Sequence, residues 1–401
     1  MKILQVIHGF PPYYMAGSEV YTYNLCQELK KENEVFVFTR IENPYEDPYT
    51  ISDEEYHGIR IRRINKPQRD YTLTDKYLDG KMDELFGQYL EEINPDVVHI
   101  GHLSHLSTNL PRIAKEHNCP VIYTLHDFWL KCYKGQLVKP DLKICEGPSD
   151  ENCLDCVKRT FKEKWDIDDV KKYRTHMNDV FQHIDRFLSP SKFLLEFHAS
   201  NGVDRNKFVH SKYGFNKDLI KKRHRIYSKG SEISFGFMGR IIPVKGIKLL
   251  LEAFSELDKG ELHIFGSVGG QKPFLEKYTN ERVVFDGPFD NWEINEVLEK
   301  IDVLVVPSLW YENSPLVIQE AFLAGIPVIT SDIGGMAELV ENGVDGYTFR
   351  VRDKESLKEA MKNIIDDPEV LNNLKVDEKK VRSIEDDVKH IQDIYEEVIR
   401  I

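Results

Sequence analysis

The sequence predicts an α/β protein of two doubly wound, Rossmann-like domains, and two observations lead to this fold class. Short apolar runs alternate along the chain with longer amphipathic segments, which is typical of parallel sheets covered by helices on both faces. A polar, charged stretch at residues 217–232 interrupts this alternation, and we interpret it as a linker. We therefore expect an N-terminal domain over residues 1–216, a C-terminal domain over 233–383, and a final helix over 384–401 that crosses back to the N-terminal domain.

Each expected strand is a short apolar run, and each expected helix is a longer segment with apolar residues at helical spacing. In the N-terminal domain the expected strands are Lys2–Ile7, Glu34–Thr39, Ile59–Ile64, Asp96–Ile100, Val121–Leu125 and Arg186–Leu188. In the C-terminal domain they are Ile233–Met238, Glu261–Phe265, Val283–Phe285, Val303–Val306, Pro327–Thr330 and Tyr347–Phe349. The expected helices include Glu19–Lys31, Lys81–Ile93, Gly246–Leu257, Asn291–Lys300, Pro315–Ala324, Met336–Glu341 and Ile384–Ile399.

Composition and charge exclude several classes of protein. The 401 residues carry a net charge of −13, which argues against a general nucleic-acid-binding protein. The sequence contains no run of 18 apolar residues, so we expect no membrane span. Met1–Phe10 reads as a first strand and not as a signal peptide, and we therefore expect a cytoplasmic protein. The basic segment Arg60–Arg69 could contact anionic lipids at a membrane surface, although a solvated surface is the alternative.

Two glycine-flanked cations follow the first strand of the C-terminal domain. Arg240 comes directly after this strand and Gly239, at the end of a strand where ligands bind in open α/β sheets. Lys245 follows in a short loop, next to Gly246. The guanidinium group offers a fork of donors to phosphate oxygens, and the lysine adds a compact positive charge. This pair predicts a diphosphate site.

A second run in this domain opens a helix. Ser314 and Pro315 are expected to be the N-cap and the first helical residue, which places Glu312 in the preceding loop and Glu320 in the second turn. Amide groups at a helix N-terminus suit an anion, and carboxylates suit the hydroxyl groups of a sugar. The expected donor-binding residues of this run are Glu312, Asn313, Ser314, Pro315, Leu316, Val317 and Glu320.

These runs, together with Asp332-Ile333-Gly334-Gly335 and Glu338, resemble the retaining GT-B glycosyltransferases of family 4. The resemblance implies a GT-B fold whose two domains face a central cleft. It also implies a hexosyltransferase that moves a sugar from a nucleotide-diphosphate donor, most commonly a UDP-sugar, with retention of configuration. By resemblance, Arg240 and Lys245 hold the diphosphate and stabilise the leaving nucleotide, Glu320 binds the ribose, and Glu312 lies at the donor sugar.

The resemblance extends into the N-terminal domain. Gly17-Ser18 stands where the family usually has two adjacent glycines, so the details of this donor-binding loop depart from the pattern. The resemblance places His126 near the reacting carbon, among the catalytic residues, and His102 also lies on the expected acceptor side. The dinucleotide fingerprint G-x-G-x-x-G is absent after the first strand, which argues against a nicotinamide enzyme.

The sequence says less about the acceptor and the reaction than about the donor. The family often uses a glycan or a lipid-linked acceptor, which indicates polysaccharide assembly and leaves peripheral membrane contact open. No cofactor or metal is expected for catalysis, because the two cations and the helix N-terminus carry charge for the leaving group. Asp166-Ile167-Asp168 looks like a metal-binding D-x-D but is interpreted as a solvated surface. A sugar-nucleotide epimerase or isomerase of the same architecture is the alternative, and a non-catalytic sensor is a third reading.

Four cysteines cluster within 25 residues of one another, in the sequence order Cys132, Cys145, Cys153 and Cys156. Their number suits a tetrahedral structural zinc ion, which would stabilise a long loop with little core of its own. An iron–sulfur cluster or four unrelated thiols are the alternatives.

Overall fold

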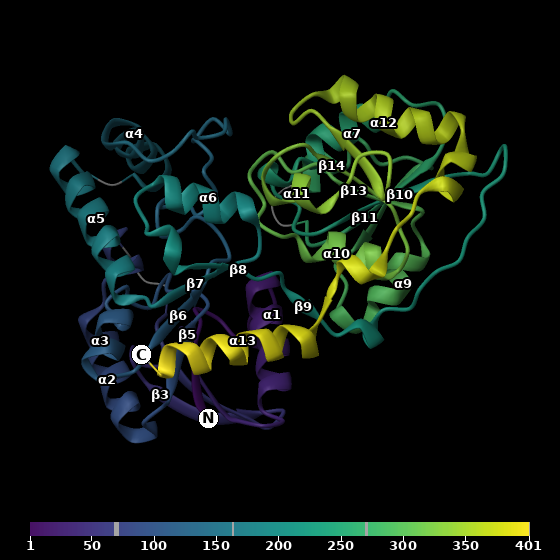
Figure 1. The fold of residues 1–401 in the computed structure, drawn as a ribbon. Helices are drawn as coiled ribbons and strands as arrows, with labels where there is room; N and C mark the ends of the chain where they lie inside the picture. The colour runs from purple at the N-terminus through teal and green to yellow at the C-terminus, as the bar shows by residue number, and fades with distance from the viewer. Residues whose placement is uncertain (68–71, 163, 269–271, 401) are drawn as a thin grey trace. The chain divides into compact units, whose positions relative to one another are not determined.

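The computed structural model describes residues 1–67, 72–162, 164–268 and 272–400. The chain forms two compact units (Figure 1). The first comprises Met1–Pro140, Cys145–Phe215 and Arg382–Ile401, and the second comprises Asp141–Ile144 and Asn216–Val381. Each unit is a sheet covered by helices, so the predicted fold class of two Rossmann-like α/β domains is confirmed.

The first unit contains an eight-stranded sheet in the order β3-β4-β2-β1-β5-β6-β7-β8. All neighbouring strands are parallel except β3 and β4, which pair antiparallel. The strands are β1 (Lys2–Val6), β2 (Glu34–Ile41), β3 (Ile51–Tyr56), β4 (Ile59–Asn65), β5 (Val97–Ile100), β6 (Val121–Thr124), β7 (Arg186–Ser189) and β8 (Phe208–His210). The six predicted strands are confirmed. β3 was missed because it is a mostly exposed edge strand in which half of the residues are charged, and it carries no apolar run.

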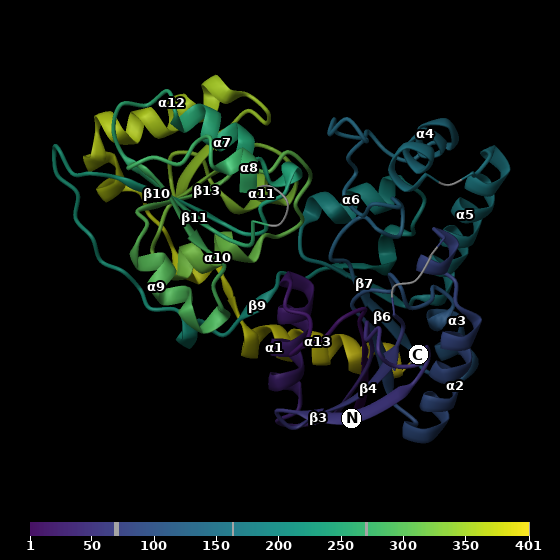
Figure 2. The same ribbon diagram turned by 180° about the vertical axis from the view of Figure 1, so that it is seen from behind.

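Helices cover both faces of this sheet (Figures 1 and 2). Helices α2 and α3 pack together on one face, and α1 packs with the C-terminal helix α13 on the other. The helices of the unit are α1 (Gly17–Leu29), α2 (Gly80–Ile93), α3 (Leu110–Glu116), α4 (Asp150–Phe161), α5 (Ile167–Val180), α6 (Lys192–Ser200) and α13 (Ile384–Ile399).

Helix α13 is bound to the first unit through its apolar face. Each of the apolar residues that predicted this helix is buried: Ile384, Val388, Ile391, Ile394, Tyr395 and Val398. Just before it, β16 (Arg382–Ser383) pairs with β9 (Gly214–Phe215). The buried hydroxyl of Tyr395 also hydrogen-bonds Gln5 of β1 at 3.1 Å, so the helix continues the core of this unit.

The second unit contains a six-stranded parallel sheet in the order β12-β11-β10-β13-β14-β15. Its strands are β10 (Ser234–Met238), β11 (Glu261–Phe265), β12 (Val283–Gly287), β13 (Val303–Val306), β14 (Val328–Ser331) and β15 (Gly346–Phe349). Its helices are α7 (Ile247–Phe254), α8 (Lys272–Leu275), α9 (Ile294–Glu299), α10 (Leu316–Leu323), α11 (Gly334–Leu339) and α12 (Lys354–Asp366). All predicted strands of this half are confirmed.

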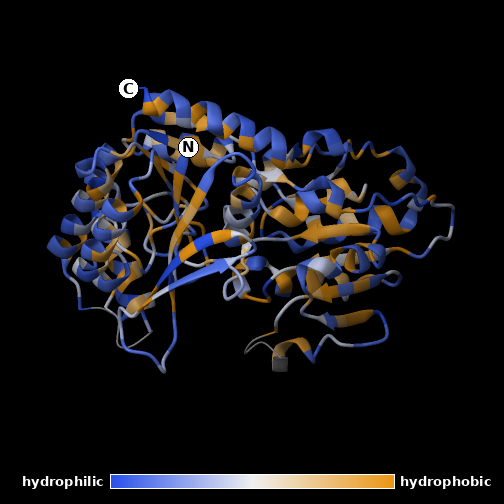
Figure 3. Cartoon of the chain, turned by 90° about the horizontal axis from the view of Figure 1, so that it is seen from below, coloured by the Kyte–Doolittle hydropathy of each residue, from blue (hydrophilic) through white to orange (hydrophobic). Residues whose placement is uncertain are grey.

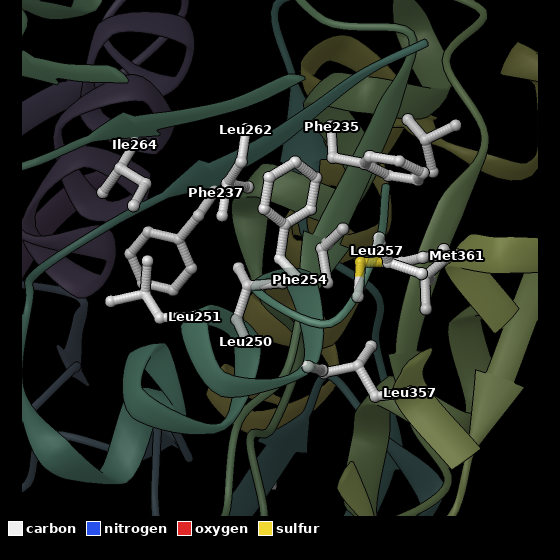
Figure 4. Close-up of a cluster of buried hydrophobic side chains, with 14 of the residues drawn as sticks. Phe235, Phe237, Leu250, Leu251, Phe254, Leu257, Leu262, Ile264, Leu357 and Met361 are labelled. Carbon is white, nitrogen blue, oxygen red and sulfur yellow. The ribbon is translucent and has the colours of Figure 1, made fainter. Parts of the chain in front are cut away.

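Apolar side chains from the sheet and from α7 and α12 form the core of the second unit. Phe235 and Phe237 of β10 meet Leu250 and Phe254 of α7, with Met361 of α12 beside them (Figure 4). Coloured by hydropathy, the strands are predominantly hydrophobic, while the helices carry hydrophilic residues on their outer surfaces (Figure 3). The burial of these large side chains holds the central strands in place, and the predicted site residues follow the carboxyl ends of those strands.

The basic segment Arg60–Arg69 is mostly neutralised within the first unit. Arg62 pairs with Asp53 at 2.7 Å and with Glu92 at 2.8 Å. The buried Arg63 pairs with Glu54, and residues 68 and 69 lie outside the described part of the chain. No helix in the described part of the chain combines the length and the apolar character that crossing a bilayer requires.

Candidate functional site

In each sheet the order in which the chain adds strands reverses between two central strands, and predicted site residues follow those strands. In the second unit the chain runs outward from β10 in one direction and from β13 in the other, so the switch point lies between these strands. Ligands of open α/β sheets bind beyond the carboxyl ends of strands at such a point. Arg240 follows β10, and Ser308 and Glu312 follow β13.

The carboxylate of Glu312 contacts three polar side chains at this switch point, those of Lys245, Ser308 and Trp310. One oxygen, Oε1, lies 2.5 Å from Lys245 Nζ, 2.7 Å from Ser308 Oγ and 3.0 Å from Trp310 Nε1. Glu312 is 7% exposed, so a charged group this deep requires such donors. The structure therefore brings two predicted residues, Lys245 and Glu312, into direct contact.

Two glycines make this approach possible. Gly246 has φ +76°, and a Cβ there would lie 1.9 Å from the Pro307 carbonyl oxygen. A Cβ on Gly335 would lie 1.4 Å from the Asn313 carbonyl oxygen, and the Gly335 amide donates to the Glu312 carbonyl at 2.8 Å. Only glycine fits either position, which explains why Lys245-Gly246 and Gly334-Gly335 accompany Glu312 in the sequence.

Arg240 and Glu320 are the two charged residues of this site that have no bonding partner in the described part of the chain. The exposed Arg240 follows Gly239, whose amide donates to Phe265 O at 3.0 Å and continues the sheet beyond β10. Glu320 is partly buried in α10, and burial raises the pKa of its carboxyl group to about 7. A free guanidinium group and a desolvated carboxyl group suit a ligand with both anionic and hydroxyl groups.

The predicted N-cap of the neighbouring helix was wrong. Helix α10 begins at Leu316, and its N-cap is Pro315, whose extended ψ of 122° delays the first turn by one residue. Ser314 makes no capping bond, and its Oγ accepts a hydrogen bond from Gln319 Nε2 at 2.9 Å. The amides of Leu316 and Val317 lie in the first turn and Glu320 in the second, as predicted from the pattern.

The first unit carries a separate polar cluster at the carboxyl ends of β1, β5 and β6. His8 Nε2 lies 3.3 Å from the buried carboxylate of Glu19, which Ser18 Oγ contacts at 2.9 Å. The His8 and His102 rings lie 4.4 Å apart, and His102 Nε2 is 3.5 Å from Asp127 Oδ2. Gly17 is the first residue of α1. The predicted residues Ser18 and His102 therefore belong to one cluster.

His126 follows β6, next to this cluster. Its Nδ1 lies 2.6 Å from the hydroxyl group of Tyr213, and the two rings stack at 5.6 Å. Burial lowers the pKa of His126 to about 3, so its imidazole is neutral at physiological pH. Tyr21 contacts both rings and donates to the buried Asp387 of α13 at 2.9 Å. The imidazole is thus held in a fixed orientation.

Sequence reasoning missed several residues of these clusters. His8 stands at the end of β1, and that position alone was a usable signal. Ser308 and Trp310 lie four and two residues before Glu312, but their residue types did not signal these contacts. Tyr213 gave no local signal, because it meets His126 only through a tertiary contact. Asp166 of the D-x-D sequence accepts hydrogen bonds from the amides of Asp168 and Asp169 as the N-cap of α5, which accounts for it structurally.

The predicted metal ligands lie together in the first unit, around one cavity. All six cysteines are free thiols. Within residues 1–67, 72–162, 164–268 and 272–400, no three histidine, cysteine, aspartate or glutamate side chains are already arranged as a set of metal ligands.

Comparison with known proteins agrees with this architecture. Residues 15–211 match the family model "Glycosyltransferase Family 4", and residues 217–381 match "Glycosyl transferases group 1". Glycogen synthase of Mycobacterium tuberculosis is 34% identical over 391 residues, which cover 92% of this chain and 87% of that protein. The chain therefore belongs to the group 1 glycosyl transferases, and it is a glycosyltransferase enzyme.

Solved structures show the same GT-B fold. Sucrose-phosphate synthase from Thermosynechococcus elongatus superimposes with a TM-score of 0.73 at 18% identity, covering 100% of this chain and 99% of that one. Anabaena HepE in complex with UDP and glucose superimposes with a TM-score of 0.70 at 17% identity, covering 99% and 100%. At these identities the likeness supports the fold alone.

Proposed function

We propose that this glycosyltransferase is a retaining hexosyltransferase that transfers a sugar from a UDP-sugar to a glycan or lipid-linked acceptor in polysaccharide assembly. Two observations at the switch point of the second unit support the donor site. Arg240 has no side-chain partner among the described residues, and Lys245 contacts Glu312. UDP is the proposed nucleotide because the fold neighbour HepE holds UDP. Placement in the cytoplasm and peripheral membrane contact remain predictions, and the pairing of Arg62 and Arg63 weakens the second.

In the proposed reaction the second unit holds the donor. Arg240 and Lys245 bind the diphosphate, and Lys245 exchanges its contact with Glu312 for phosphate oxygens. Glu312 keeps Ser308 and Trp310 as partners and accepts hydrogen bonds from the sugar, while Glu320 accepts the ribose hydroxyls. The two cations offset the charge that develops on the leaving phosphate, so this step requires no metal ion.

The first unit is proposed to hold the acceptor. His126, held by its 2.6 Å contact with the Tyr213 hydroxyl group, is proposed to lie at the sugar near the reacting carbon. His102 lies on the acceptor side of the same sheet edge. To retain the configuration of the reacting sugar carbon, the acceptor hydroxyl group attacks this carbon from the same face as the leaving group. An oxygen of the leaving phosphate takes the proton of that hydroxyl group.

A donor screen tests the proposal. The protein is incubated with several nucleotide sugars, and free nucleotide diphosphate and the configuration of the new bond are measured. Slow release without an acceptor, faster release with one and retained configuration are expected. An altered sugar without release would favour the isomerase, binding without release would favour the sensor, and inverted configuration would contradict the mechanism.

Affinity for the donor is expected to rise with pH through the state of Glu320. Its raised pKa of about 7 makes the free group neutral at pH 5 and charged at pH 8. Two ribose hydroxyls donate to the charged form, so binding lowers this pKa and releases a proton. The dissociation constant for UDP-glucose should therefore fall by up to about tenfold per pH unit between pH 5 and 7, then level off.

Calorimetric titration of UDP-glucose at several pH values measures this effect. The diphosphate of a nucleotide sugar does not titrate in this range, so the dependence reports on the protein. Glu320→Gln is the matched control, because it keeps the shape of the side chain and removes its titration. The same pH dependence in Glu320→Gln would contradict the assignment.

A further inference from the structure

Four cysteines surround one small cavity of about 30 Å³ in the first unit. Cys153 and Cys156 lie on one face of α4, one turn apart, and Cys132 and Cys145 come from the loop before that helix. Apolar side chains, Leu137 among them, fill the rest of the lining. A cavity of this size has room for a single ion or about one water molecule.

Backbone hydrogen bonds hold the loop that carries Cys132 and Cys145. The Gly135 amide closes the turn onto the Cys132 carbonyl at 2.8 Å, and the Cys145 amide donates to the Leu137 carbonyl at 2.7 Å. These bonds fix the loop on which two of the four cysteines lie, beside the cavity.

Positively charged groups border the same cavity. Lys131 and Lys139 are among the residues that line it. Cys153 and Cys156 also lie in the first two turns of α4, whose N-terminus carries partial positive charge. A divalent cation held by four thiolates has a net charge of −2, which these groups offset.

We propose that Cys132, Cys145, Cys153 and Cys156 bind one structural zinc ion in tetrahedral coordination. Binding replaces four S–H bonds with four Zn–S bonds and releases four protons to solvent. The sulfurs surround the cavity without yet forming a ligand set, so binding draws the loop onto α4 by small side-chain rotations. The small volume favours one ion over an iron–sulfur cluster. The site is separate from the donor-binding residues, and it fixes the long loop that follows His126.

The metal content of the full chain tests this proposal. The protein is purified without chelators from zinc-supplemented medium, and zinc, iron and free thiols are counted per chain. One zinc per chain is expected, and a thiol-blocking mercurial should release it as four thiols react. Cobalt substitution should give the strong visible absorption of tetrahedral thiolate coordination. No bound metal, bound iron, or a disulfide between any two of the four cysteines would overturn the proposal.

Substitutions locate the site independently of activity. The double variant Cys153→Ser/Cys156→Ser should lose the zinc and melt at a lower temperature. The matched controls Cys26→Ser and Cys119→Ser change buried cysteines that do not line the cavity, and they should retain it. If the double variant does not fold, removing zinc from the native chain with a chelator keeps the test decisive. An unchanged melting temperature after complete removal would contradict the structural role.

Discussion

Replacing Arg240 with alanine is expected to lower kcat/KM for sugar transfer by about 10²–10³-fold, the range measured for loss of one preorganised charge-stabilising donor. The exposed guanidinium group makes no hydrogen bond or ion pair within the described residues, so its removal breaks no internal contact. The lost interaction is the one with the diphosphate, which grows as the leaving group gains charge. The melting temperature should therefore stay within about 1–2 °C of the wild type, since surface substitutions usually change stability little.

Initial rates with saturating acceptor and varied donor measure this effect. Arg240→Lys should recover part of the activity, because a lysine keeps the charge and loses the fork that binds two phosphate oxygens. Arg400→Ala, which removes the exposed C-cap arginine of α13 that pairs with Glu396, is the control and should keep full activity. Near-normal transfer by Arg240→Ala would contradict the assignment of the diphosphate site.

The fold could be predicted from the sequence to the extent that apolar runs determine it. The buried parallel strand β13 is a continuous apolar run, and in β5 only His99 interrupts one; the positions of both strands agree with the prediction. The strand β3 escaped prediction because its sequence, ISDEEY, is polar on an exposed edge, where pairing depends on the neighbouring strand β4. The residues of α13 were predicted from helical spacing alone, since that helix buries a complete apolar face.

The candidate site was predictable where glycine and charge stand together in the sequence. Lys245-Gly246 and Gly334-Gly335 signal close backbone approaches, and those approaches bring Lys245 to Glu312. The partners that orient Glu312 and His126 were not predictable, because Trp310 and Tyr213 are ordinary aromatic residues until the chain is folded. The N-cap of α10 could not be predicted from the local sequence, because Ser314 accepts a hydrogen bond from Gln319 and Pro315 is the N-cap residue.

The stretch expected to be a linker is anchored to the second unit by one buried carboxylate. Asp302 is 1% exposed and precedes β13. Its Oδ1 accepts hydrogen bonds from Arg223 at 3.1 Å and from the Tyr227 hydroxyl at 2.9 Å, and its Oδ2 accepts the Ser234 amide at 2.9 Å. Arg225 pairs with the same carboxylate. A single side chain thus ties residues 223–227 to the start of β10.

Replacing Asp302 with alanine should therefore lower the free energy of unfolding of the second unit by about 3–5 kcal/mol, the range for removing one partner of a buried ion pair. The loss arises because Arg223, 8% exposed in its side chain, loses the carboxylate 3.1 Å away and is left with Glu299 at 4.0 Å as an acidic partner. Hydrogen exchange of the β10 and β13 amides reports on this unit separately. Asp258→Ala, at an exposed aspartate, should stay within about 0.5 kcal/mol. Equal protection in Asp302→Ala and Asp258→Ala would show that Asp302 does not hold the stretch. The free energy of unfolding of Asp302→Asn should lie between those of these two variants, because its amide oxygen still accepts the Ser234 amide.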